Sequence, residues 1–426
     1  MDKMSSSSSS SSPTSISPTI SSIPQHQQHK TLVLVGGTGK LGQELAPGLR
    51  TAAPGFATFT ALVRDPTSAA AIRLQRQGWT LHVISNHEWT NTATSHTNYN
   101  NNSDQPPISA SPTLIQALTG AFAVVSALSG PRLVELEQAL IDAAIHAHVT
   151  LFVPSQYGVD QRRWQREQGS SISKSSSSLF PSYQKKRQVL EYYHQRRIQE
   201  QRRNDQEDSS RGFLSLLYVA CGLFADVIFE SMLVDRSTQQ AAIVEDDGHA
   251  LYSFTRRSDV GRVLAHAVKD PQYHRPKPWN DNTHEHDPSP ALQSCHFLTM
   301  AGTTLSLYDA LTLLQSYSST RPFTITHISL ATSLAQERAL LESYHQNHNT
   351  TALYPAFRAH ILNRPVLGDT GMDTSRSSTH RGSSTNSTEQ TNTSSSINLG
   401  PYGISLEPLH ETFRKQYQDD KNPGDR

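Results

Sequence analysis

The chain has 426 residues, enough for two average domains or for one domain with long insertions. Its 37 Lys and Arg residues balance 37 Asp and Glu residues, so no net charge draws it toward nucleic acid or an anionic membrane. Two cysteines exclude a disulfide scaffold and a multi-cysteine zinc site, and no apolar run approaches the roughly 20 residues of a membrane-spanning helix. These features predict a cytoplasmic protein without nucleic-acid or membrane partners.

Long polar segments lower the hydrophobic content to 35%. Residues 1–29 are Ser-rich and lack an apolar region, which predicts a disordered tail rather than a secretory signal. Similar segments recur at about 86–110, 161–180, 272–290 and 368–399. None has an apolar period that would offset its ordering entropy, so each is predicted to be a disordered insertion in a surface loop.

Between these segments, strand-like runs alternate with helix-like runs. The expected strands are 31–35, 56–64, 79–85, 121–130, 149–158 and 212–224. The expected helices are one that begins at Leu41 and those at 111–120, 131–148, 181–195 and 256–268. Strands that read as unbroken Val, Leu and Phe runs are covered on both faces, as in a parallel sheet between two helical layers. The alternation predicts an α/β fold with a Rossmann-type doubly wound parallel sheet.

The later part of the chain contains further amphipathic helices. Ser258 or Asp259 is expected to cap the helix at 256–268. Three more helices are expected at 305–317, 329–344 and 406–417. They can cap a pocket, but their sequence does not specify the ligand.

A glycine-rich turn joins the first strand to the first helix. Gly37, Gly39 and Gly42 form G-x-G-x-x-G, and Gly36 gives a second glycine register. A phosphate-binding loop of the Walker type is excluded because Leu41, rather than Ser or Thr, follows the lysine. Glycines between a strand and a helix expose backbone N–H groups to an anion, so the turn predicts a dinucleotide site. The expected contacts are Gly36, Gly37, Thr38, Gly39, Lys40, Leu41 and Gly42.

The end of the second strand indicates which dinucleotide binds. An acidic residue there binds a ribose 2′-hydroxyl, whereas Arg suits a 2′-phosphate. Arg64 comes first and Asp65 follows it, and Lys40 in the turn adds positive charge. The alternative is that Arg64 and Asp65 are a solvated loop pair. We expect the cofactor to be NADP(H).

Six segments in order resemble the NmrA-like, isoflavone-reductase-like group of atypical short-chain dehydrogenases. They are LVLVGGTGKLG, ALVRDP, AVVSALSG, LFVPSQYG, CGLFADV and YSFTRRSDVGRVLAHAVKDP. The resemblance runs from about Thr31 to about Asp270. It implies a Rossmann NADP-binding domain at 30–220 and a smaller C-terminal substrate lobe at 221–426.

Residues that follow the fourth and fifth strands are expected near the nicotinamide, because reactive groups lie beyond the carboxyl ends of such strands. The expected cofactor contacts are Ser126, Ala127, Leu128, Pro154, Ser155 and Tyr157. Ser126 can hold the nicotinamide ribose or cap the following helix. Tyr157 is either a packing aromatic or a proton donor, and with Phe224 it is expected to line the substrate pocket.

The helix at 181–195 carries the candidate acid/base. Lys186 shares one helical face with Val189, Leu190 and Tyr193, so it is expected to point inward, where lost solvation lowers the pKa of an amine. The resemblance implies that a helix lysine acts as general acid/base, and Lys186 fits the family spacing. Tyr183, one turn earlier, is expected to cooperate with it. The alternatives are that Tyr183 or Lys185 occupies the lysine position, or that 185–187 is a solvated charge run.

The resemblance implies an NADPH-dependent oxidoreductase that reduces a small, aromatic or conjugated compound. The alternative is a non-catalytic redox sensor of the NmrA type, which binds the dinucleotide and reports to a protein partner. The histidines lack ligand spacing on one helix face, which argues against a metal site.

Overall fold

A computed structural model describes residues 30–53, 55–89, 110–162, 181–207, 212–226, 234–235, 238–245, 251–277, 290–317, 322–347 and 401–421. The expected tail at 1–29 and most of the expected insertions lie outside these ranges. The described edges of the insertions include two short 3₁₀ helices, η1 (Asn86–Glu88) and η3 (Pro271–Tyr273).

A seven-stranded sheet forms the centre of the molecule, in the order β11-β6-β5-β4-β1-β2-β3. Its strands are β1 (Lys30–Val35), β2 (Phe56–Val63), β3 (Thr80–Val83), β4 (Ala121–Ser126), β5 (Leu151–Val153), β6 (Ser215–Ala220) and β11 (His296–Thr299). Every neighbouring pair is parallel. The first six strands have the order of a doubly wound dinucleotide-binding sheet, so the expected fold class is confirmed.

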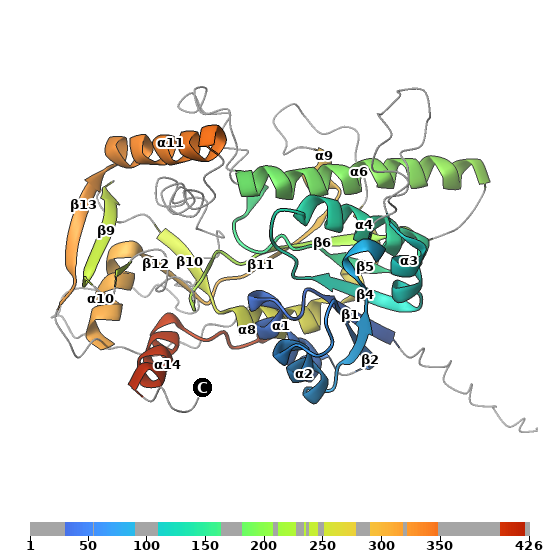
Figure 1. Cartoon of the computed structure of the whole chain (residues 1–426), viewed down its shortest axis with the longest axis horizontal. Helices are drawn as coiled ribbons and strands as arrows, with labels where there is room; N and C mark the ends of the chain where they lie inside the picture. The colour runs from blue at the N-terminus through green and yellow to red at the C-terminus, as the bar shows by residue number, and fades with distance from the viewer. Residues whose placement is uncertain are drawn as a thin grey trace, which may run out of the picture.

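Helices cover both faces of this sheet (Figure 1). One layer contains α1 (Lys40–Ala52), α2 (Ala69–Arg76) and α8 (Arg257–Ala267). The other contains α3 (Pro112–Leu118), α4 (Leu133–His146), α6 (Pro181–Glu207) and the short α9 (Pro290–Gln293).

The central strand β1 serves both layers because successive side chains of a strand point to opposite faces. Leu32 and Leu34 belong to the core beneath α1 and α8, whereas Val33 and Val35 belong to the core beneath α3, α4 and α6. All four side chains are essentially inaccessible to solvent. This burial on both faces explains why the strand has no polar alternation.

Two three-stranded sheets lie beyond the central one, together with a third core. One contains β7 (Leu223–Phe224), β10 (Leu251–Thr255) and β12 (Thr303–Ser306). The other contains β8 (Val234–Asp235), β9 (Gln240–Glu245) and β13 (Thr324–Ser329). The remaining elements are α10 (Leu307–Tyr317), α11 (Leu330–Asn347), η5 (Pro401–Gly403) and α14 (Leu409–Lys421). The third core contains residues of β7, β9, β10, α10, α11 and α14, together with Val159 and Tyr183 from earlier in the chain.

The chain returns to the central sheet after leaving it, because β11 pairs with β6 and α8 packs on α1. The division of the chain into two domains at 220/221 therefore stays a prediction from the sequence.

The expected cap of the helix at 256–268 is wrong: Arg256 is the N-cap, and Asp259 lies within α8. The Asp259 carboxylate accepts a hydrogen bond from Glu407 N instead, at 2.7 Å. Among the described helices, none is both long and apolar enough to cross a membrane.

Candidate active site

The glycine turn brings strand, turn and helix into backbone contact. Gly36 follows β1 with a φ of +75°, a conformation that favours glycine, and its carbonyl accepts from Gly39 N at 3.0 Å. A Cβ on Gly42 would lie 2.2 Å from the Gly36 oxygen, so only glycine fits there. The N-cap of α1 is Gly39, which offers no side-chain cap. The first N–H groups of α1 thus remain for an anion.

Polar side chains of α1 and α2 support this turn. Thr38 and Leu41 are half-buried and Lys40 is exposed. The Gln43 side chain donates to the Thr38 carbonyl at 3.0 Å and accepts from Arg73 of α2 at 2.7 Å. Sequence reasoning missed Gln43 and Arg73, since contacts across 30 residues leave no local pattern.

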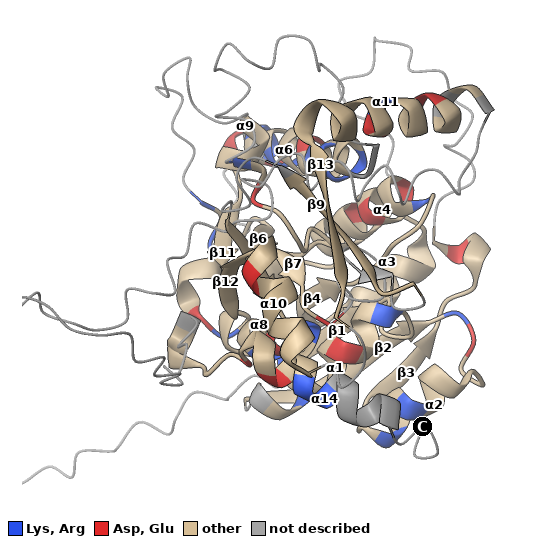
Figure 2. Cartoon of the chain, turned by 90° about the vertical axis from the view of Figure 1, so that its left-hand side faces the viewer, with Lys and Arg blue, Asp and Glu red and all other residues tan. Residues whose placement is uncertain are grey.

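Arg64 is exposed and directly follows β2. Oδ1 of Asp65 accepts from the backbone N and the hydroxyl of Thr67, at 2.8 and 2.6 Å. These bonds from Thr67 lower the pKa of Asp65. Figure 2 shows further basic residues on α2, beside β2 and β3. The acidic member of the pair is thus engaged within its own loop.

The loop after β4 touches the glycine turn directly. Ala127 N donates to the Val35 carbonyl at 2.8 Å, and a Cβ on Gly36 would lie 2.8 Å from the Ala127 carbonyl. The Ser126 hydroxyl is fully buried and donates to the Glu137 carboxylate. The Ser126 hydroxyl is therefore directed into the protein and not to the surface. Ser126 also does not cap the following helix, because the N-cap of α4 is Arg132. Leu128 is half-buried in the same loop.

The loop after β5 lies beside the loop after β4. Ser155 donates through its hydroxyl to the Leu128 carbonyl at 2.7 Å and through its backbone N to Glu137 Oε1 at 3.3 Å. Pro154 is buried. Tyr157 is 5% exposed, and its hydroxyl has no hydrogen-bond partner among the described residues. Burial, then Glu137 and Cys221, raise the pKa of Tyr157 well above its usual value, so its phenol keeps its proton.

Lys186 points from α6 into this region. Its Nζ donates to the Tyr157 carbonyl at 2.7 Å, and Gln156 binds the Lys186 carbonyl in return, at 3.0 Å. The residue as a whole is half-buried, but its ammonium end is enclosed. Burial lowers its pKa to about 8, against the opposite effects of Cys221 and Glu137. Val189, Leu190 and Tyr193 are buried on the same face, as their spacing predicted.

Tyr183 and Phe224 lie at the edge of the same region. Tyr183 is 6% exposed and packs with Val159 in the third core, and burial raises its pKa. Phe224 is half-buried on β7 and packs against the core beneath α1 and α8. Cys221 N and Gly222 N, just before β7, both donate to the Gly158 carbonyl. The structure thus brings the ends of β5 and β6 together around Lys186.

The main residue that sequence reasoning missed is Glu137 of α4, which is 1% exposed. Leu133 and Leu140 flank it at i−4 and i+3 on the buried face of the helix. The sequence could have indicated Glu137, because its spacing puts a carboxylate on the apolar face of the helix, where an acidic residue is unusual.

A buried ion pair fixes this helix against α6, since Asp142 Oδ1 lies 2.7 Å from Arg196 Nε.

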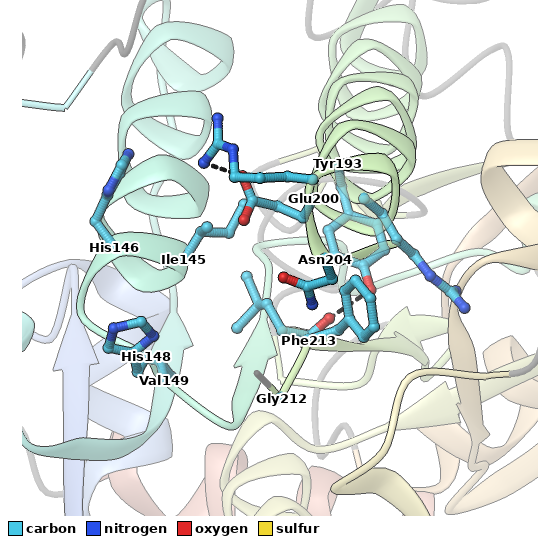
Figure 3. Close-up of a pocket in the computed structure, with 12 residues that line it drawn as sticks. Ile145, His146, His148, Val149, Tyr193, Glu200, Asn204, Gly212 and Phe213 are labelled. Atoms are coloured by element: carbon cyan, nitrogen blue, oxygen red, sulfur yellow. Dashed lines mark hydrogen bonds and ion pairs between the residues drawn. The ribbon is translucent and has the colours of Figure 1, made fainter. Parts of the chain in front are cut away.

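A separate cavity of about 140 Å³ lies between α4 and α6. His146 and His148 face it from one side and Glu200 and Asn204 from the other (Figure 3). Its lining includes Gly212, Phe213 and Leu214, just before β6, so it lies at the amino ends of the strands, opposite the glycine turn. None of the expected site residues lines it. Within the described ranges, no group of three or more His, Cys, Asp or Glu residues is placed to hold a metal ion.

Comparisons with known proteins agree with this architecture. Oxidoreductase aprR of Aspergillus flavus is 28% identical over 159 residues, 37% of this chain, and the match spans about half of that relative (46%). The leucoanthocyanidin reductase–NADPH complex from Vitis vinifera has a TM-score of 0.53 at 14% identity, over 91% of this chain and 99% of that one. A structure reported for pinoresinol-lariciresinol and phenylcoumaran benzylic ether reductases gives 0.51 at 15% identity, with the same coverage.

At these identities the two solved structures show the fold alone. The model of the NmrA-like family matches residues 28–199, which contain the glycine turn, the loops after β4 and β5, and Lys186. The resemblance inferred from the sequence motifs is thereby confirmed for this part of the chain. Residues 28–199, less than half of the chain, thus resemble the NmrA-like family.

Proposed function

We propose that the protein is an NADPH-dependent reductase of a small aromatic or conjugated compound, with Lys186 as its general acid. The relatives support the class of reaction, since one is named an oxidoreductase and another is a reductase solved with NADPH. The observation that carries the proposal is the position of the Lys186 amine, bound to the Tyr157 carbonyl where β5 ends.

The glycine turn fits the pyrophosphate of a dinucleotide. Its uncapped helix start presents N–H groups, and the glycine at 42 leaves no side chain between turn and helix. Arg64, exposed at the end of β2, would bind a 2′-phosphate, since a guanidinium pairs with phosphate through two hydrogen bonds. Asp65 is less available to a ribose hydroxyl, because Thr67 binds its Oδ1 twice.

NADPH supplies a hydride when bound, and the chain supplies the proton. Lys186 is charged below its pKa of about 8, so near neutrality it holds the proton that the reduced substrate takes up. Tyr157 and Phe224 would flank the substrate with apolar surface. Tyr183 would pack beside Lys186 on α6 and would not act as a proton donor, because burial raises the pKa of its phenol and so weakens it as an acid. The two unpaired buried cysteines, Cys221 and Cys295, favour a reducing compartment such as the cytoplasm.

Two measurements separate this proposal from the redox-sensor alternative. NADPH and NADH binding is followed by calorimetry, and NADPH oxidation is followed with a panel of aromatic enones and quinones. A reductase binds NADPH and oxidises it with at least one compound, and Lys186→Met lowers that rate about 100- to 10,000-fold with binding retained. Lys185→Met, one residue away, is the matched control. Binding without turnover across the panel would favour a sensor, and no binding would overturn both.

A further inference from the structure

Glu137 is a buried carboxyl group at the meeting point of three elements of the site. Its Oε1 accepts from the Ser126 hydroxyl after β4 and from the Ser155 backbone after β5. Its Oε2 is buried and has no hydrogen-bond partner among the described residues. An ionised carboxylate costs several kcal/mol in such surroundings unless a positive charge lies near. Glu137 therefore has a compensating partner or holds a proton.

A positive charge reaches the same loop from α6, because Lys186 Nζ donates to the Tyr157 carbonyl, two residues after the Ser155 N that binds Glu137. The Lys186 ammonium acts on Glu137, and the Glu137 carboxylate acts on Lys186 in the opposite sense. Burial raises the pKa of Glu137 to about 7 and lowers that of Lys186 to about 8. The other titratable groups that face this pair are the Tyr157 phenol and the Cys221 thiol. Burial raises the pKa of both, so both are neutral in this range.

Glu137 also fastens the two loops that border the expected nicotinamide site. It binds Ser126 and Ser155, and Ser155 in turn binds the Leu128 carbonyl at 2.7 Å. The loops after β4 and β5 thus form one unit with a single carboxyl group beneath them. The same group is electrostatically linked to the amine across the site.

We propose that Glu137 is the positioning residue of Lys186: its carboxylate favours the ammonium form of the lysine while its Oε1 holds the two cofactor loops together. The inference rests on the proposed role of Lys186 as proton donor. After the lysine has given up its proton, the carboxylate favours uptake of the next one. The effect of an opposite charge on a nearby amine is about 1–3 pKa units.

Infrared spectroscopy of the full chain tests the link without any turnover. Protein labelled with ¹³C-glutamate is titrated, and the C=O stretch of protonated Glu side chains is followed. A band with a midpoint near pH 7 is expected for Glu137, and it is absent from Glu137→Gln. In Lys186→Met the midpoint moves to higher pH by about one unit or more, whereas Lys185→Met leaves it unchanged.

The labelled wild type and Lys186→Met carry the test even where Glu137→Gln does not fold. The idea is overturned by a midpoint that is the same with and without the Lys186 amine, or by the absence of a glutamic acid that titrates near neutrality. An activity measurement adds a second readout: Glu137→Gln shifts the basic limb of the pH–rate profile to lower pH, and Glu137→Asp restores it in part. Absence of turnover would count against the reductase alone, because the infrared titration does not depend on it.

Discussion

The Lys186 ammonium and the Tyr157 carbonyl oxygen are joined by a hydrogen bond of 2.7 Å. Backbone, rather than a carboxylate, is thus the direct partner of the amine. The backbone holds the amine at the carboxyl end of β5 without neutralising its charge, so burial prevails and lowers its pKa to about 8. This relationship makes the lysine a group that can release a proton near physiological pH.

The rate of the proposed reduction depends on this pKa. Lys186 donates only when charged, so kcat is expected to be constant below pH 7 and to fall as the pH rises through about 8. An amine with the usual pKa of 10.5 would maintain the rate for two further pH units. The measurement is kcat at saturating NADPH from pH 6 to pH 10. A flat profile up to pH 10 would contradict the assignment.

Arg64→Ala is expected to change cofactor preference. Loss of a hydrogen-bonded guanidinium from a phosphate costs about 1.5–3 kcal/mol, so the Kd of NADPH should rise about 10- to 100-fold while that of NADH changes little. Arg76→Ala, an exposed arginine on α2, serves as the control. Calorimetry with both nucleotides decides the matter: equal losses would show that Arg64 does not contact the 2′-phosphate.

Gly42→Ala is expected to remove nucleotide binding and lower the Tm. The added Cβ would lie 2.2 Å from the Gly36 oxygen and 2.6 Å from the Gly37 Cα, so the turn must move away from α1. Gly212→Ala is the matched control, because a Cβ there meets no atom within 4 Å. The two variants are compared by thermal unfolding and NADPH titration. Retained binding in Gly42→Ala would show that this turn does not form the pyrophosphate site.

Local sequence predicted the parts of the site that depend on local geometry. The glycine turn needs only a strand, a bend and a helix in succession, and it lies where expected. The inward face of α6 follows from helical spacing, which also placed Lys186 correctly. The expected role of Asp259 as a helix cap was wrong, because its carboxylate binds the backbone N of Glu407, which comes 148 residues later.

Long-range pairing limited the prediction of the rest. The periodicity of apolar residues indicates which face of a helix is buried, but it does not indicate which helix or strand packs against that face. Helical spacing puts Glu137 on the buried face of α4, but only the fold places it beside Ser126 and Ser155. Strand β11 likewise joins the central sheet from beyond residue 290, after the chain has formed strands of the other two sheets.

Glu137 also makes a prediction for stability. Its folded pKa is raised from 4.5 to about 7, so the folded chain holds this proton more tightly than the unfolded chain. That contribution to stability is fully present below about pH 4.5 and is lost as the pH rises through 7. Each unit of pKa difference corresponds to about 1.4 kcal/mol, so the total loss is a few kcal/mol at most.

Glu137→Gln removes this titration. The free energy of unfolding of the variant, relative to wild type, should therefore rise steadily between pH 5 and pH 7 and level off above. Urea unfolding at several pH values measures the difference. Glu135→Gln is the control on the same helix, because Glu135 is exposed and paired with Arg132 at 2.6 Å. A difference between Glu137→Gln and wild type that stays constant from pH 5 to pH 7 would mean that Glu137 enters the folded state already ionised.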